Sequence, residues 1–490
     1  MDLNTSPLVR HSPRIFLVLS ILVLGLLAGA AVSLVNPAIA FAVLIGLVSA
    51  LVLAQDARWG LFGVMAIITL LPFAAVPLNV GFSPTFLDLV TVMLVAVWFA
   101  QLATGRRLGW VSTPLDLPLA LFLALAFFSF IVGLSYSGLT VMTLRHFVEI
   151  IIAIALYFVV VNVLRERSDL ERATQVLLLL GFGAALLGIV LYVIPNNDAI
   201  RLLSLLRVFK YPAGDGVLRF VEDNPDLPKR AIATSVDPNV LGGMLILLTA
   251  LAAPQLLAVR RLFRREIVIA MLGAMVICLL LTFSRGSLLG AAVALTFIVF
   301  AWLSRRMPAL VAAMLTVGGG VVLAAAGFAA LSVLPFTQSY TQHLVQGLLG
   351  QDQATLMRFG EYKDALNLIA RYPWFGVGFA GVPDIDLYVG VSSVYLLMAS
   401  EMGLVGLAAF LVIIFVFVAS GWLAFRAAPE LDPILLGALA AVLGALVGGI
   451  FDHYFFNLDF PHSVTLFWLF VGLAMSGARL QRLTAVAAGS

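Results

Sequence analysis

Long uninterrupted apolar runs constrain this chain more than any other feature of its sequence. Runs such as 15–35, 173–194 and 433–451 contain no charged residue and are about 20 residues long, the length of a helix that crosses a bilayer. They lack the alternation of polar and apolar residues that is typical of outer-membrane strands. Because 62% of the 490 residues are hydrophobic and only 11% are charged, a water-soluble core cannot hold them. The sequence therefore predicts an all-α polytopic membrane protein.

The apolar runs predict about 14 membrane-spanning helices. Their approximate ranges are 15–35, 38–55, 60–78, 84–103, 115–135, 145–164, 173–194, 238–258, 267–283, 286–303, 309–334, 392–424, 433–451 and 462–478. Ala28-Gly29-Ala30 resembles a signal-peptidase site, but apolar sequence continues past it. We therefore expect an uncleaved first helix.

The positions of the cations predict how these helices are oriented. With the N-terminus in the cytoplasm, every short turn on that side carries arginine, as at Arg58, Arg260 and Arg305. The positive-inside rule then places both termini in the cytoplasm and two long loops at the outer face. Arg145 and Arg285 remain as the cations at short outer connections, where either could also snorkel to lipid headgroups. The net charge of +3 thus reflects membrane orientation and does not indicate nucleic-acid binding.

The two loops divide the chain into five segments. These are N-terminal helices 1–195, a first outer loop 196–236, helices 237–334 that include Ser284-Arg285-Gly286, a second outer loop 335–391, and C-terminal helices 392–490. Amphipathic pieces are expected at 200–209 and 357–371, and Gly286 is expected to permit a tight hairpin. Loops this long usually carry function, so we expect the chemistry at the outer face.

Motifs of soluble enzymes are missing from the sequence. We find no P-loop, HExxH or Gly-x-Ser-x-Gly elbow. The five histidines are too dispersed along the chain to indicate a metal site, and one cysteine, Cys278, cannot form a disulfide framework. We therefore expect neither a metal nor a cofactor, and a site built from outer-face cations, carboxylates and histidine.

Four blocks in the C-terminal half form an ordered set. They read RAIATSVDPNVLGGML (230–245), LTFSRGSLLGAA (281–292), MRFGEYKDALNLIARYPWFGVGFAG (357–381) and VYLLMASEMGLVGLAAF (394–410). In this order and spacing they resemble the signature blocks of the O-antigen ligase and O-antigen polymerase family of integral-membrane glycosyltransferases. The N-terminal half resembles that family only in consisting of hydrophobic helices.

The resemblance implies a GT-C-like bundle in the inner (cytoplasmic) membrane. Such an enzyme, a polysaccharide polymerase or ligase, passes a glycan from undecaprenyl pyrophosphate to a hydroxyl of a glycan or lipid-linked acceptor at the outer face. We expect an inverting, metal-independent displacement. The implied partners are the undecaprenyl-pyrophosphate-linked glycan, the lipid bilayer, and a chain-length regulator or flippase, with no nucleic acid.

The resemblance also assigns cations to the pyrophosphate. Arg230 and Arg285 would form the clamp, with Arg358 as a further ligand, and Arg285 would also act in catalysis. We expect Arg219, which lies outside the four blocks, to bind the pyrophosphate as well. Charge grows on the leaving group as the glycosidic bond breaks, and guanidinium groups hold phosphate oxygens in a fork. As alternatives, Arg230 could be a solvated charge, and Arg358 could pair with Glu361 three residues later.

Five further residues are expected to support the site. They are Asp237, Asn239, Arg145, Tyr395 and Glu401. Two of them also have purely structural interpretations. Asp237 followed by Pro238 predicts a helix N-cap with proline at the first helical position, and Arg145 could pair with Glu149.

The general base departs from the family pattern. Nine residues before Glu401, where the family usually has a His-Asn pair, this chain has Ser392 and Ser393, and serine cannot act as a base near neutral pH. The segment FDHYFFNLDFPH (451–462) offers a replacement, and we expect His453 to be catalytic because an unperturbed histidine pKa is about 6.5. The alternatives are Asp452, Asp459, His462 and His343, and His453 could instead belong to an aromatic belt. A second departure is Ala233, where the family commonly has glycine.

Two rival functions remain open at this point. A transporter or flippase of lipid-linked sugars would place charges at the bilayer midplane, whereas nearly all candidates here fall at the ends of spans. A relative of the peptidoglycan polymerases would need a catalytic carboxylate in an outer loop. The candidates for that carboxylate are Asp352, Asp364, Asp384 and Asp386.

Overall fold

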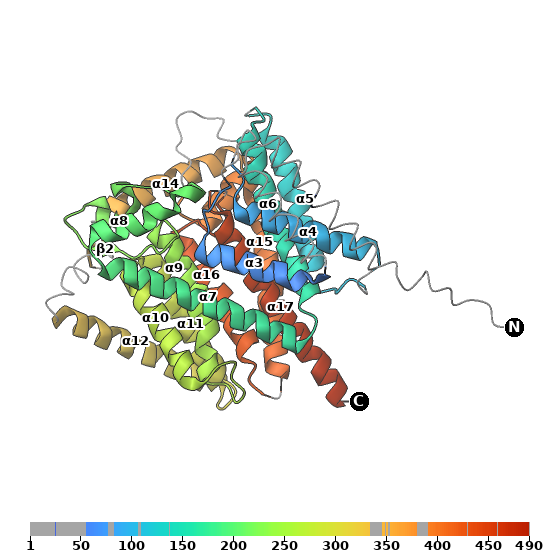
Figure 1. The fold of residues 1–490 in the computed structure, drawn as a ribbon. Coiled ribbons are helices and arrows are strands. Elements are labelled where there is room, and N and C mark those ends of the chain that lie inside the picture. The colour runs from blue at the N-terminus through green and yellow to red at the C-terminus, as the bar shows by residue number, and fades with distance from the viewer. Residues whose placement is uncertain are drawn as a thin grey trace.

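A computed structural model shows a bundle of long helices (Figure 1). It describes residues 25, 55–76, 83–105, 109–136, 138–333, 345–347, 349–350, 353–379, 391–428, 430–457 and 459–489. In that part, ten helices are long and apolar enough to cross a membrane. They are α4 (Phe86–Ala103), α5 (Asp116–Gly133), α6 (Val141–Val163), α7 (Arg167–Val193), α9 (Pro238–Ala252), α11 (Arg285–Leu303), α12 (Ala309–Val333), α15 (Val394–Ala427), α16 (Pro433–Phe451) and α17 (Pro461–Gly489). The predicted all-α membrane architecture is confirmed.

Two further apolar helices are shorter than a full span. They are α3 (Ala57–Leu70) and α10 (Arg265–Leu281), which fall where the sequence predicted spans at 60–78 and 267–283. The predicted spans 15–35 and 38–55 lie outside the described residues, apart from residues 25 and 55. The count of 14 spans and the orientation of the termini therefore remain predictions.

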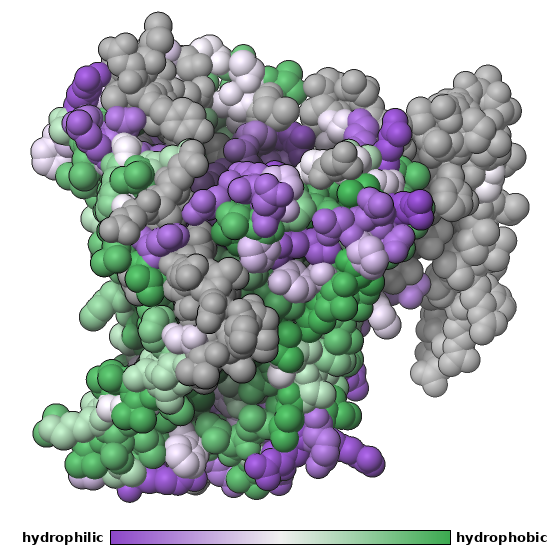
Figure 2. All heavy atoms as spheres, turned by 90° about the vertical axis from the view of Figure 1, so that its left-hand side faces the viewer, coloured by the Kyte–Doolittle hydropathy of each residue, from purple (hydrophilic) through white to green (hydrophobic). Residues whose placement is uncertain are grey.

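The spanning helices differ strongly in how much of each is buried inside the bundle. α9, α16 and α17 are the most deeply buried spans, whereas α12 is mostly exposed and packs chiefly along α11. In Figure 2 a broad hydrophobic band lies between hydrophilic zones above and below it. Because apolar side chains face lipid as readily as a protein core, this band is the surface that we expect to contact the bilayer.

Proline and acidic residues define where central helices begin. Asp237 caps α9 by accepting hydrogen bonds from the backbone of Asn239 and Val240, with Pro238 at the start of the helix. Asp432 caps α16 in the same way, again followed by proline. The N-cap predicted at Asp237 is confirmed, since a carboxylate satisfies N–H groups that lack partners in the first turn.

Shorter elements gather at one end of the bundle. They are α8 (Asn196–Ser204), η1 (Leu205–Phe209), η2 (Asp215–Val217), β1 (Arg219–Phe220), η3 (Val221–Asp223), β2 (Lys229–Arg230) and α14 (Gln353–Arg371), while η4 (Ala253–Leu256) extends α9 at the other end. Leu203, Val217, Leu218 and Ile232 form a small core of their own beneath α8. Figure 1 shows α8, β2 and α14 close together at this end. The two amphipathic segments predicted at 200–209 and 357–371 both lie here, and we call it the loop end.

The turn before α11 differs from the predicted hairpin. Phe283 adopts the left-handed backbone conformation (φ 54°), while Gly286 lies inside the first turn of α11. Gly286 serves close packing instead, because a Cβ at this position would lie 3.3 Å from the Cβ of Phe451 in α16. The prediction that Gly286 makes the turn is therefore wrong.

The loop that follows α14 satisfies the backbone hydrogen bonds that a break in α15 leaves open. Gly403 has φ 69°, so backbone groups on either side of it lose their helical partners. The loop supplies new partners on both sides of the break. The N–H groups of Val377 and Gly378 in the loop donate to the carbonyl oxygens of Ser400 and Glu401. The N–H groups of Leu404 and Val405 in α15 donate to the carbonyl oxygens of Pro373 and Trp374. Irregular backbone at membrane depth is tolerated where protein satisfies it in this way.

Candidate functional site

Arg230 is held rigidly at the loop end of the bundle. Its Nε donates to the carbonyl oxygen of Thr282 at 2.8 Å, and its Nη2 donates to Oδ1 of Asn239 at 2.8 Å. The side chain is half-buried, so the interpretation of Arg230 as a solvated loop charge is wrong. Burial lowers the pKa of Arg230, against the opposing effect of nearby carboxylates, Asp237 first. The bond to Thr282 brings Arg230 next to the turn that carries Arg285.

Arg219 lies directly across from Arg230. In the antiparallel pair of β1 and β2 these two residues are register partners, so their side chains leave the ribbon on the same face. Like charges in this arrangement repel, and Arg219 Nε is buried without a hydrogen-bond partner in the described part of the chain. An anion between the two guanidinium groups would relieve both penalties.

Arg285 begins α11 and faces the second outer loop. Its guanidinium group lies directly against Gly347, in the space that a larger side chain at that position would occupy. The preceding residue, Ser284, gives α11 no side-chain cap and instead shares a 2.9 Å hydrogen bond with Ser287. Ser284 therefore gives the first N–H groups of α11 no side-chain acceptor, and a helix N-terminus that carries an arginine favours an anion.

Arg358 pairs with Asp452 and not with Glu361. Arg358 Nη2 lies 3.9 Å from Asp452 Oδ2, whereas Glu361 accepts a 3.0 Å hydrogen bond from the backbone of Ser392. The i, i+3 pair considered as an alternative is therefore wrong. The Arg230 guanidinium is also within electrostatic range of both Arg358 and Asp452. Arg230 and Arg358, from two separate blocks of the sequence, thus lie close together, next to the turn that carries Arg285.

Tyr362 connects three segments around this cluster. Its hydroxyl lies 3.1 Å from the carbonyl oxygens of Ser392 and of Ile450, so α14 is tied to the start of α15 and the end of α16. Tyr362 follows Arg358 by one helical turn and shares its face of α14. Burial raises the pKa of Tyr362. Sequence reasoning missed this residue, although its i+4 spacing from Arg358 was a usable signal.

Asp452 and His453 stand beside the position where the family has its histidine. The backbone N–H of Val394 donates to the carbonyl oxygen of Asp452 at 3.2 Å, two residues after Ser392. His453 Nδ1 lies 3.9 Å from Asp452 Oδ1, too far for a hydrogen bond, and has no hydrogen-bond partner in the described part. Burial raises the pKa of Asp452, and the charges of His453 and Arg358 partly oppose that shift.

Tyr454 lies beneath these residues and reaches α11. It is 2% exposed, and its hydroxyl is 3.5 Å from the hydroxyl of Ser287. Its ring packs against Gly243 of α9, where a Cβ would collide with it. Burial raises the pKa of Tyr454, so the phenol stays neutral. The segment with Asp452 and His453 is thus fixed relative to Arg285, a connection that no sequence pattern indicated.

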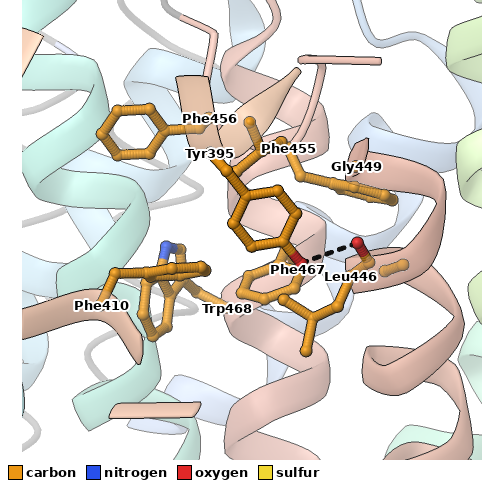
Figure 3. Close-up of a pocket in the computed structure, with 10 residues that line it drawn as sticks. Tyr395, Phe410, Leu446, Gly449, Phe455, Phe456, Phe467 and Trp468 are labelled. Atoms are coloured by element: carbon orange, nitrogen blue, oxygen red, sulfur yellow. Dashed lines mark hydrogen bonds between the residues drawn. The ribbon is translucent and has the colours of Figure 1, made fainter. Parts of the chain in front are cut away.

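Tyr395 lies in an apolar cavity, away from the arginines. The cavity, of about 10 Å³, is lined by Phe410, Phe455, Phe467 and other apolar residues (Figure 3). Across it the Tyr395 hydroxyl donates to the carbonyl oxygen of Leu446 at 2.8 Å. With its hydroxyl satisfied and no charged neighbour in the lining, Tyr395 holds α15 against α16 and does not face the cation cluster.

Arg145 is the centre of a second polar group, on α4 and α6. It bonds to Glu149 at 2.6 Å and to Asp88 at 3.2 Å, so the structural pair with Glu149 is confirmed. Glu401 lies in a different place again, at the break in α15, where its carbonyl oxygen also accepts a 2.6 Å bond from Ser129. Oε2 of Glu401 is buried and has no hydrogen-bond partner in the described part.

The remaining candidates lie away from the arginines or cannot be placed. His462 is 3% exposed and packs against the rings of Phe73 and Phe460, with no hydrogen-bond partner in the described part. Asp459 is exposed. His343, Asp352, Asp384 and Asp386 lie outside the described residues. Within that part, no three His, Cys, Asp or Glu side chains are grouped so that they could hold a metal ion.

Comparison with known families agrees with the ordered blocks. Residues 269–411 match the family model described as O-antigen ligase. The resemblance to the O-antigen ligase family is confirmed. The matched region runs from α10 into α15 and includes Arg285 and Arg358, but not Arg230. No curated protein matches the chain significantly. The O-antigen ligase match supports ligase or polymerase activity in general terms.

Proposed function

We propose that the chain is a membrane glycosyltransferase that moves a glycan from a polyprenyl-pyrophosphate carrier to an acceptor hydroxyl. The observation that carries this proposal is the grouping of Arg219, Arg230 and Arg358 at the loop end, beside Asp452 and next to the turn at Thr282 that leads to Arg285. Arginine suits pyrophosphate because guanidinium is always charged and donates in a fork. We take the carrier to be undecaprenyl pyrophosphate and the loop end to be the outer face of the inner membrane.

The cations would act mainly in the transition state. Arg230 and Arg285 would bind the pyrophosphate oxygens, whose negative charge increases as the bond to the anomeric carbon breaks. Arg230 needs little reorganisation for this, since Thr282 and Asn239 already fix two of its donors. Arg219, facing Arg230, and Arg358 would add charge around the same group. No metal ion is required in this scheme.

His453 would take the proton of the acceptor hydroxyl. In an inverting displacement the hydroxyl oxygen attacks the anomeric carbon from the side opposite the leaving pyrophosphate, and the released proton passes to the imidazole. Asp452 would stabilise the imidazolium that forms, and Arg358 would keep Asp452 ionised. The placement of both residues beside Ser392 supports a base that has moved from α15 to the segment after α16.

A trapped intermediate tests the substrate class. Cells that express Arg285→Ala in place of the normal chain should accumulate the polyprenyl-linked glycan, which mass spectrometry of the lipid extract identifies. Arg201→Ala, at an exposed loop arginine, is the control and should not cause accumulation. If Arg285→Ala cells accumulate no lipid-linked glycan while product is still lost, the proposal is wrong. A transporter would instead move labelled carrier lipid across liposomes that contain no acceptor.

A further inference from the structure

A second candidate site lies at the end of the bundle opposite the arginine cluster. An apolar groove of about 260 Å³ runs between α11, α15 and α16. Its lining consists of Phe297, Phe300, Val418, Trp422, Leu439 and Leu443. These residues lie three to four helical turns from Arg285 along α11, at the end that the positive-inside rule places at the cytoplasm. We call it the inner groove.

Aromatic rings give the inner groove a defined shape. Trp422 stacks on Phe300 with ring centroids 6.1 Å apart and an interplanar angle of 11°, and it lies 5.9 Å from Phe297. Neighbours that point to the bundle surface, Val299 and Leu423, are exposed, so the groove borders the lipid. An apolar groove at this depth fits hydrocarbon chains.

Arginines surround the inner end of the same groove. Arg426, one turn after Trp422, is exposed and donates to the carbonyl oxygen of Ser304 at 3.1 Å. Arg306 is exposed as well, with its guanidinium 4.0 Å from the centre of the Trp302 ring. Arg305 donates to two carbonyl oxygens, of Phe425 and Ala428. Burial lowers the pKa of Arg305, and the Arg426 charge lowers it further.

The combination of groove and cations selects one class of ligand. The guanidinium groups of Arg305 and Arg426 repel each other, and Arg306 adds a further positive charge on the same turn. An anionic headgroup would neutralise this charge where its acyl chains enter the groove. Basic pockets between membrane helices on the cytoplasmic side bind anionic lipid headgroups. The tail of a polyprenyl carrier anchored at the opposite end would bring no negative charge here. We propose that the inner groove binds an anionic phospholipid of the inner leaflet, independently of the transfer reaction.

Native mass spectrometry of the full chain tests this proposal. The detergent-purified protein is titrated with phosphatidylglycerol or cardiolipin, and with phosphatidylcholine as the uncharged-headgroup comparison. Arg306→Gln combined with Arg426→Gln should weaken binding of the anionic lipids by about tenfold or more. The matched control is Arg260→Gln combined with Arg261→Gln, which removes two exposed arginines elsewhere on the same face and should leave that affinity unchanged. Leu443→Trp, which fills the groove, should also lower the affinity.

Three results would overturn the proposal. Equal losses in the two arginine pairs would mean that the whole basic face attracts anionic lipid. Equal affinity for phosphatidylglycerol and phosphatidylcholine would remove any role for the headgroup charge. Displacement of bound lipid by a neutral polyprenol, with no preference for anionic phospholipid, would assign the groove to a carrier tail. Circular dichroism of each variant confirms that it remains folded before the titrations are compared.

Discussion

Arg358 Nη2 lies 3.9 Å from Asp452 Oδ2, which joins α14 to the segment that follows α16. The contact places the carboxylate between a permanent cation and the imidazole of His453. Because the same carboxylate is buried, its ionisation is linked to both neighbours. The pH dependence of the transfer rate should therefore reflect the ionisation of Asp452 and His453.

Asp452→Asn should separate activity from stability. Burial raises the pKa of Asp452, so the folded state favours the neutral carboxyl group. The contribution of this group to the free energy of unfolding is therefore present at low pH and is lost as pH rises through the raised pKa. Asparagine removes that loss, and thermal unfolding at neutral pH should occur at the same or a higher temperature. Transfer activity should nevertheless fall, and the acid limb of the wild-type profile should begin above the ordinary aspartate pKa of about 3.9. An unchanged rate and profile would contradict the assignment.

Moving the base back to α15 should rescue a base-deficient variant. His453→Gln should lower kcat by roughly a hundredfold, since positioned proton transfer contributes about that much or more. Ser392 lies two residues before Val394, whose N–H donates to the backbone carbonyl oxygen of Asp452, so adding Ser392→His should bring an imidazole near this segment. The double variant should recover part of the lost kcat with little change in KM. Absence of recovery in a folded double variant would count against the relocated base.

Gly347→Ala should impair Arg285 without touching it directly. The guanidinium of Arg285 occupies the space where the new methyl group would lie, so the side chain must move. Displacement of a catalytic group by about 1 Å can lower the rate roughly a hundredfold. The expected signature is a lower kcat/KM with an unchanged temperature of unfolding. The control is Gly216→Ala, in the first outer loop, where a Cβ has open space and activity should be normal.

Gly378→Ala should destabilise the packing of the loop after α14 against α5 and the break in α15. Gly378 has φ 77°, and a Cβ there would lie 2.5 Å from the Cα of Gly133. The left-handed conformation and the overlap together should lower the free energy of unfolding by about 2 kcal/mol or more. Scanning calorimetry of the detergent-solubilised protein measures this loss. A variant as stable as the parent would show that the loop does not pack on α5 as described.

The sequence predicts the positions of the helices better than it predicts the breaks within them and the turns between them. Continuous apolar runs place α11 and α16 nearly to the residue, and Asp237 with Pro238 marks the start of α9 correctly, although α9 ends six residues before the predicted end of its span. The break at Gly403 escapes such reasoning, because a glycine inside an apolar run is equally compatible with an intact helix. The turn at Phe283 escapes it as well, since bulky residues rarely adopt positive φ.

The candidate site divides in the same way. Arg230, Arg285 and Arg358 are identifiable from blocks of sequence, and the fold places Arg230 near Arg358 and next to the turn that carries Arg285. Tyr454 is not identifiable, because it acts through a contact with a helix distant in sequence, and Tyr362 is marked only by its i+4 spacing from Arg358. Tyr395 shows the opposite error, since its place in a recognisable block does not put it near the cations.

The backbone conformation of Ala233 explains why the family commonly has glycine at this position. Ala233 adopts φ 46° in a buried position, a conformation that glycine adopts without strain. The glycine common in the family at this position therefore suits the turn between β2 and α9. Alanine adds a buried methyl group that partly offsets the strain.

Transfer by the purified chain tests the central claim most directly. The full-length protein is reconstituted in liposomes with a polyprenyl-pyrophosphate-linked glycan and its acceptor, and product formation is followed on gels. Arg285→Gln should lower kcat/KM by about a hundredfold or more, because it removes a cation from the leaving group, while Arg201→Gln should transfer normally. Normal transfer by folded Arg285→Gln would contradict the assignment of Arg285 and of the arginine cluster around it.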